Sequence, residues 1–133
     1  MIRHRSNSRG GVAASELALL LPFLVFLLGI TVDYGRIFYC SQIVNNCAQN
    51  GAIYGSDAVL ASQSPYTSIQ QAALADATDL SPQPTVTSTT GSDASGNAYV
   101  RVTVNWTFKS ITSLPGIPST VNLSRTVQMR VSP

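Results

Sequence analysis

The feature that most restricts this chain is a run of sixteen residues, 17–32, that contains no charged side chain and reads LALLLPFLVFLLGITV. Counting back to Val12 extends the run to 21 residues, in which Glu16 is the one ionisable group. At about 1.5 Å rise per residue, such a helix is roughly 31 Å long, which matches a hydrocarbon core of about 30 Å. Residues 12–32 are therefore predicted to cross a membrane, and a chain of 133 residues leaves room for one modest domain beside the span.

Positive charge is concentrated before this span. Arg3, Arg5 and Arg9 precede every acidic residue, whereas the chain beyond Gly11 carries five basic and six acidic side chains and is close to neutral. By the positive-inside rule, the N-terminus stays in the cytoplasm and the segment after Asp33 is exported. A nucleic-acid binder needs a basic stripe to neutralise phosphates, and the sequence has none beyond its first nine residues, so we exclude that class.

An amphipathic pattern continues the helix past the span. Small or apolar residues recur at intervals of three and four, with polar residues between them, so the helix is predicted to extend through 33–55. We expect this stripe to be an assembly surface, which docks first the chain's own sheet and then neighbouring helices. Its members are Ile37, Val44, Cys47, Ala48 and Gly51.

The two cysteines of the chain lie on this helical extension. Cys40 and Cys47 are seven positions apart, so their Cα atoms are expected to be roughly 10.5 Å apart, whereas a disulfide needs less than about 7 Å. An internal bond is therefore excluded within one straight helix. Two interpretations stay open, namely small packing residues on one face and a disulfide to a partner chain in an oxidising compartment.

Residues 56–133 are predicted to form an extracytoplasmic globular domain. After a turn-rich stretch, SIQQAALADATDL at 68–80 reads as one short helix. The composition then shifts to Thr, Ser and Val, with strict apolar–polar alternation from Tyr99 to Lys109 and weaker strand patterns at 85–90 and 121–131. The expected fold class is α+β, with a long N-terminal helix that is transmembrane and then amphipathic, a short second helix and a three-stranded antiparallel sheet.

The sequence predicts no catalytic centre, no metal site and no cofactor. His4 is the only histidine, and it lies in the basic leader, on the wrong side of the membrane for Ser–His, Cys–His or His–metal chemistry. Asp76 and Asp79 are three apart on the predicted short helix, and we interpret them as part of a solvated face. Asp93 lacks the further acidic positions of a calcium loop, so a plain turn is expected there.

The spacing between Gly11 and Glu16 carries a sharper interpretation. A short basic leader ends in glycine, and a glutamate is the fifth residue after it, which resembles the prepilin-peptidase site of type IV pilins and pseudopilins. The resemblance implies that the bond between Gly11 and Val12 is cut, so that 1–11 is a leader peptide. It also implies that Glu16 neutralises the new terminal ammonium, which needs an opposite charge in the membrane.

Within that class, residues 9–55 resemble the TadE-like family of the tight-adherence (Flp, type IVc) pilus system. Proteins of this family combine small residues and a glutamate, an apolar run with an early proline, a polar residue before an aromatic-Gly-Arg step, and a Gly-Ala tail. The matching positions are Arg9, Gly10, Glu16, Pro22, Asp33, Tyr34, Gly35, Arg36, Tyr39, Gln42, Ala48, Gly51, Ala52 and Tyr54. Leu17, Asn50 and Ile53 depart from the pattern, because Phe is common at the first position and charged residues are usual at the other two.

The resemblance implies a pilin-like fold and a non-catalytic minor pilin or pseudopilin that assembles in, or supports biogenesis of, a tight-adherence pilus or related secretion apparatus. It places the chain in the bacterial inner membrane, or on a surface pilus, with a cytoplasmic N-terminus. Expected partners are the lipid bilayer, a prepilin peptidase, other pilin-like subunits and tight-adherence assembly proteins. Two alternatives stay open: a signal-anchored exported adhesion or binding protein outside any pilus, and a membrane-tethered hydrolase. The main objection to a hydrolase is that the exported segment has no histidine, because the only one in the sequence, His4, lies in the basic leader.

Overall fold

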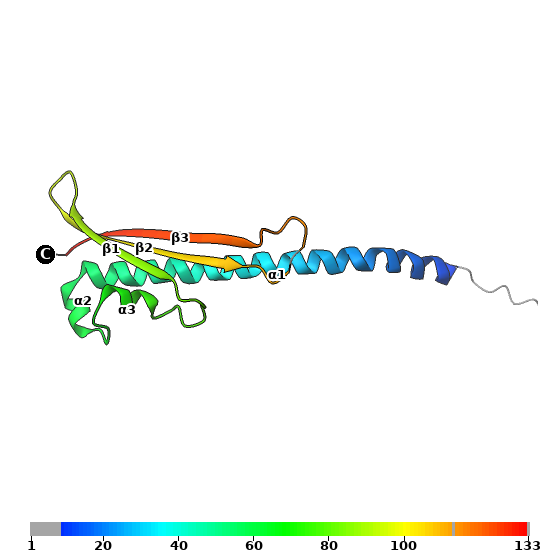
Figure 1. Cartoon of the computed structure of the whole chain (residues 1–133), viewed down its shortest axis with the longest axis horizontal. Coiled ribbons are helices and arrows are strands. Elements are labelled where there is room, and N and C mark those ends of the chain that lie inside the picture. Colours follow the sequence, from blue (N-terminus) through cyan, green and yellow to red (C-terminus); the bar gives the residue numbers. More distant parts are fainter. Residues whose placement is uncertain (1–8, 113, 133) are drawn as a thin grey trace, which may run out of the picture.

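One long helix forms the axis of the molecule. The computed structural model describes residues 9–112 and 114–132, and the leader residues Arg3, His4 and Arg5 lie outside this part. Helix α1 (Arg9–Ser56) is continuous over 48 residues and includes Pro22. Its end agrees with the predicted end near Gly55, whereas it begins three residues before the predicted start at Val12. Figure 1 shows its N-terminal half extending away from the rest of the protein.

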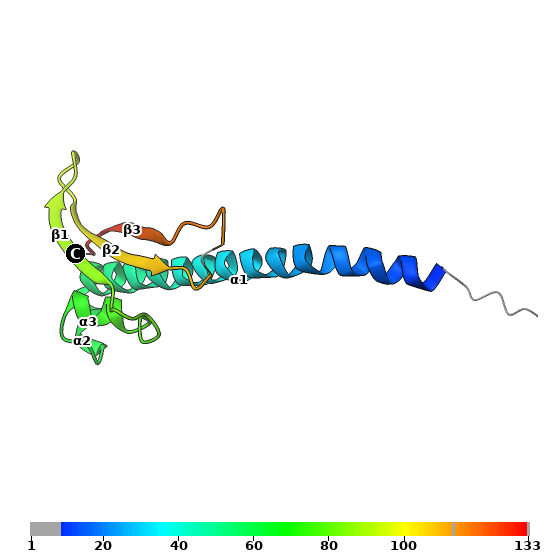
Figure 2. The ribbon, with the colours of Figure 1, turned by 45° about the vertical axis from the view of Figure 1, so that its right-hand side comes forward.

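A three-stranded antiparallel sheet lies along the C-terminal half of α1 (Figures 1 and 2). Its strands are β1 (Thr85–Ser92), β2 (Ala98–Lys109) and β3 (Thr120–Arg130), in the spatial order β1-β2-β3. In the central strand, Val100 faces Thr90 on one side and Met129 on the other. The predicted α+β fold and its antiparallel sheet are confirmed.

The core lies between α1 and one face of this sheet. Alternation along β2 places Val100, Val102, Val104 and Phe108 towards α1, where each is fully buried. The side chains between them face outwards and pair with β3, as where the hydroxyls of Thr103 and Thr126 lie 2.9 Å apart. A period of two with one apolar face is typical of a sheet that is covered on one side only.

Two short helices follow α1, one more than the sequence pattern predicts. Helix α2 (Ala58–Gln63) lies where a loop is predicted; Asp57 caps it by accepting hydrogen bonds from the amides of Val59 and Leu60. Helix α3 (Ile69–Leu74) is capped by Ser68 and is shorter than the predicted 68–80. The chain continues beyond Leu74 in tight turns, consistent with the weak helix propensity of Asp and Thr.

Candidate functional site

The predicted assembly stripe lies inside the molecule. Val44, Cys47 and Ala48 are fully buried in the core, and Ile37 is partly buried against it. These side chains face the chain's own sheet, and α3 packs against the same helix. A role for the stripe in contact with neighbouring helices stays a prediction, and in this conformation its buried members are already covered by the chain's own domain.

Gly51 lies where α1 closely approaches the domain. A Cβ atom placed on Gly51 would lie 3.0 Å from the Cβ of Ala73 and 3.1 Å from Cγ1 of Val102. One position therefore contacts both α3 and β2. The small residue that the sequence suggests for helix approach is required here by contacts within the chain.

Both cysteines are free and buried. Cys47 is fully covered and Cys40 retains 8% exposure. Burial raises the pKa of both thiols, and the neighbouring carboxylate of Asp76 acts in the same direction on Cys47. These properties agree with packing residues of low thiolate content, while a bond to a partner chain stays a prediction.

The N-terminal part of α1 is an exposed apolar rod. It is the one helix of the described chain that is long and apolar enough to cross a membrane, with a mean hydropathy of 2.2 over its most apolar window and none of that window buried. Gly11 and Val12 lie in its first turns and Glu16 follows one turn later, all three exposed. The predicted processing bond is therefore at the uncovered end of the helix.

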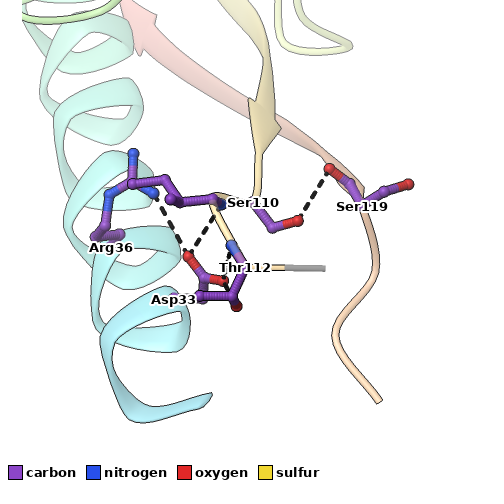
Figure 3. Close-up of polar contacts among 6 residues, drawn as sticks. Asp33, Arg36, Ser110, Thr112 and Ser119 are labelled. Carbon is purple, nitrogen blue, oxygen red and sulfur yellow. Dashed lines mark hydrogen bonds and ion pairs between the residues drawn. The ribbon is translucent and has the colours of Figure 1, made fainter. Parts of the chain in front are cut away.

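Just beyond the apolar run, Asp33 forms a polar clasp between α1 and the end of the sheet (Figure 3). Its side chain is fully buried. Its two carboxylate oxygens accept hydrogen bonds from the amide of Ile111 at 3.3 Å, from the amide of Thr112 at 3.1 Å, and from the Thr112 hydroxyl. The sequence offers one signal for this site, an acidic residue at the end of a charge-free run, but no sign of its partners.

Hydrogen bonding decides the charge state of this carboxyl. The Thr112 hydroxyl is the main cause that holds the pKa of Asp33 below its ordinary value, and the amides of Thr112 and Ile111 and the charge of Arg36 act in the same direction. Burial opposes them. Arg36 lies 3.5 Å from the carboxylate, and its guanidinium sits 5.1 Å from the ring centroid of Phe108. The hydrogen bonds of Asp33 therefore join α1 to the residues that follow β2, and the cation–π contact of Arg36 joins α1 to β2 itself. The ion pair between Asp33 and Arg36 lies within α1.

The face of α1 that turns away from the sheet is uncovered. Tyr34, Phe38 and Tyr39 are 51%, 68% and 58% exposed, and Ile53 is 43% exposed further along the helix. Large aromatic side chains are enriched at membrane–water interfaces and at protein–protein contacts. This outer face, rather than the buried stripe, is the part of the helical extension that is free for contact.

The acidic residues that the sequence offers for chemistry have structural partners or lie at the surface. Asp76 accepts a hydrogen bond from Nδ2 of Asn50 at 2.8 Å, and Asp79 is exposed. Asp93 holds a turn by accepting bonds from the amides of Ser95 and Asn97. Within residues 9–112 and 114–132, no three His, Cys, Asp or Glu side chains are grouped so that they could hold a metal ion.

These features define a class of protein: a membrane-anchored, pilin-like chain, in which one long helix supplies both the anchor and the support of a small antiparallel sheet. The TadE-like protein family matches this chain over residues 11–52, which confirms the family resemblance for that segment. The match covers most of α1 and indicates a pilin-like protein associated with tight-adherence pili. Comparison with curated proteins gives no match, and comparison with solved structures gives none either.

Proposed function

We propose that this chain is a non-catalytic minor pilin or pseudopilin that assembles in, or supports biogenesis of, a tight-adherence pilus or related secretion apparatus. The observation that carries the proposal is the division of α1 into two parts. Its N-terminal half is apolar and uncovered, whereas its C-terminal half carries the sheet on one face only. Such a helix can anchor in a bilayer and still offer a free face to neighbouring subunits.

Orientation in the membrane follows from charge. Arg3, Arg5 and Arg9 precede the span, so we propose a cytoplasmic N-terminus in the bacterial inner membrane and a domain on the opposite side. A prepilin peptidase would then meet the bond between Gly11 and Val12 at the cytoplasmic end of α1. The first amides of a helix lack partners within it, so this turn can unwind at little cost.

Glu16 is proposed to act in assembly. It lies five positions after Gly11, and after cleavage it would be about one helical turn from the new ammonium, either its own or that of an adjacent subunit. A carboxylate at the edge of an apolar span is costly unless it has a partner. We further propose that the exposed aromatic face of α1, Tyr34, Phe38 and Tyr39, contacts neighbouring pilin-like subunits.

Crosslinking and mass spectrometry of purified membranes test the proposal, because they report the neighbours of the chain directly. We expect crosslinks from the wild type to other pilin-like subunits and to tight-adherence assembly proteins. Glu16→Gln should stay in the membrane, because it removes a charge and keeps the size of the side chain, and should lose these crosslinks. Glu16→Asp, which keeps the charge, is the matched control and should retain part of them.

A wild-type chain that is anchored in the membrane and has no pilin-like neighbour would contradict the proposal. It would favour a signal-anchored exported adhesion or binding protein instead.

A further inference from the structure

The connection between β2 and β3 is uncharged and carries several aliphatic and proline residues. Its described residues are 110–112 and 114–119, and no charged side chain occurs in the sequence from Ser110 to Ser124. Ile111 is 71% exposed, although it is a large aliphatic residue. Two prolines and two further aliphatic residues follow it: Leu114, Pro115, Ile117 and Pro118.

This connection lies beside the apolar half of α1. Figures 1 and 2 both show it leaving the end of the sheet that is nearest the N-terminal half of the helix. Cδ1 of Leu114 is so close to Gly29 that a Cβ atom there would lie 2.8 Å from it. Gly29 is four residues before Asp33, about 6 Å further along the helix axis, and lies within the charge-free run. A groove continues along Pro22, Val25 and Phe26.

Four backbone amides of the connection are bonded within the protein. The amides of Ile111 and Thr112 bond to Asp33, the amide of Ser110 bonds to the carbonyl of Ser119 at 3.1 Å, and the amide of Ile117 bonds to the carbonyl of Leu114 at 3.2 Å. Pro115 and Pro118 have no amide hydrogen. Each backbone group that is satisfied internally lowers the cost of bringing irregular backbone into a low-polarity environment.

Charged and aromatic side chains lie where the charge-free run of α1 ends, beside the start of the connection, and we take them to mark the membrane surface. Lys109 ends β2 immediately before the connection, and Arg36 lies one turn above Asp33 on α1. Basic residues place their charges among lipid headgroups, and tyrosine is enriched at the same depth, where the exposed Tyr34 would lie. The connection begins on the membrane side of this boundary.

We propose that the β2–β3 connection dips into the bilayer beside α1, as a second and shallow membrane contact. The inference rests on the proposed membrane span and goes beyond it. The exposed Ile111 and the prolines would lie among the upper acyl chains, and the Asp33 clasp would fix the connection to the helix. The two contacts together set the angle of the domain to the membrane surface, which a single helix alone leaves free.

The test uses the full chain in vesicles of phosphatidylethanolamine and phosphatidylglycerol. An environment-sensitive nitrobenzoxadiazole dye is attached at Ile111→Cys, and at Pro115→Cys as a second position. Lipids with a nitroxide on the upper acyl chain should quench both dyes and leave a dye at Ser95→Cys, in the exposed β1–β2 turn, unchanged. The wild-type chain is the labelling control, because its thiols, Cys40 and Cys47, are buried.

A dye at Leu24→Cys separates this inference from the proposed span, because Leu24 is exposed in the middle of the apolar run. Quenching at Leu24, Ile111 and Pro115 supports the membrane contact. Quenching at Leu24 alone overturns it and leaves the span standing, whereas no quenching at any of the three overturns both. A blue-shifted dye at Ile111 that lipid does not quench would show that protein covers the connection, and it would also overturn the inference.

Discussion

Asp33 on α1 accepts hydrogen bonds from the backbone amide and the hydroxyl of Thr112, a residue that lies 79 positions later in the chain. The pair fixes the end of the sheet to the helix where the apolar run stops. Buried carboxylates are stable only when donors replace the water that they lose, and Thr112, Ile111 and Arg36 do so here. The clasp is therefore a structural joint between the anchor and the domain.

Removal of the carboxylate should loosen this joint. In Asp33→Ala, the amides of Ile111 and Thr112 lose their acceptor, so we expect faster hydrogen exchange at both and a lower unfolding temperature of the full chain in detergent. Asp79→Ala is the matched control, because Asp79 is an exposed acidic residue of the same domain. Equal exchange at Ile111 and Thr112 in both variants would contradict a structural role for Asp33.

Stability should also depend on pH through Asp33. Its pKa is lower in the folded chain than its ordinary value of 3.8, chiefly because of the Thr112 hydroxyl. A group with a lowered folded-state pKa contributes stability that is complete above its ordinary pKa and is lost as pH falls through the folded value. The unfolding temperature of the wild type should therefore fall at acidic pH, below the ordinary pKa, more steeply than that of Asp33→Asn.

Asp93 should also contribute to the fall of the unfolding temperature at acidic pH, so its contribution needs a separate control. The amide and side chain of Asn97 lower the pKa of Asp93 below its ordinary value. Asp93→Asn should therefore flatten part of the pH dependence, and the variant with both substitutions should flatten more of it. A slope that stays unchanged in Asp33→Asn would refute the contribution of the clasp.

The sequence predicts those parts of the structure that depend on neighbouring residues, and it does not predict contacts between residues far apart in the chain. The alternation of Tyr99–Lys109 and the charge-free run 17–32 are local patterns, and both predict the correct element. Helix α2 escapes prediction because six residues after Asp57 provide less than two turns of periodicity. The clasp escapes it for another reason: an acidic residue after a span reads as a boundary charge, and nothing local points from Asp33 to Thr112.

Gly51 offers a test of packing with a control on the same helix. Alanine at Gly51 would press against Ala73 and Val102, so we expect Gly51→Ala to be less stable than Gly35→Ala by about 1–3 kcal/mol. A Cβ atom on Gly35 would meet nothing within 4 Å, and alanine there should gain up to about 1 kcal/mol in helix propensity. Denaturant unfolding in detergent measures both. Equal stability of the two variants would show that the contact at Gly51 is not tight.

A larger residue at Gly51 cannot serve as a clean test of assembly. Gly51→Leu should disrupt the packing of β2 and α3 on α1, so a loss of partner binding in that variant would follow from damage to the domain. Assembly is better tested on the uncovered face of the helix.

Phe38 provides that test, because it is 68% exposed. We expect Phe38→Ala to change the free energy of unfolding by no more than about 0.5 kcal/mol and to reduce crosslinking to other pilin-like subunits. Val44→Ala, in the buried stripe, should destabilise the domain by about 2 kcal/mol. If Phe38→Ala retained every crosslink of the wild type, the outer face would not be the assembly surface.

The most specific prediction concerns the bond between Gly11 and Val12. We expect mature protein from peptidase-positive cells to begin at Val12, because the basic leader, the glycine and Glu16 at the fifth position coincide in this chain. A cut after Gly10 would place the glutamate sixth. Gly11→Val should block cleavage, since a bulky residue replaces hydrogen at the scissile position, whereas Gly35→Val, further along the same helix, should leave it intact. Terminal sequencing that finds Met1 or Ile2 in the wild type would overturn the prediction and favour a plain signal-anchored protein.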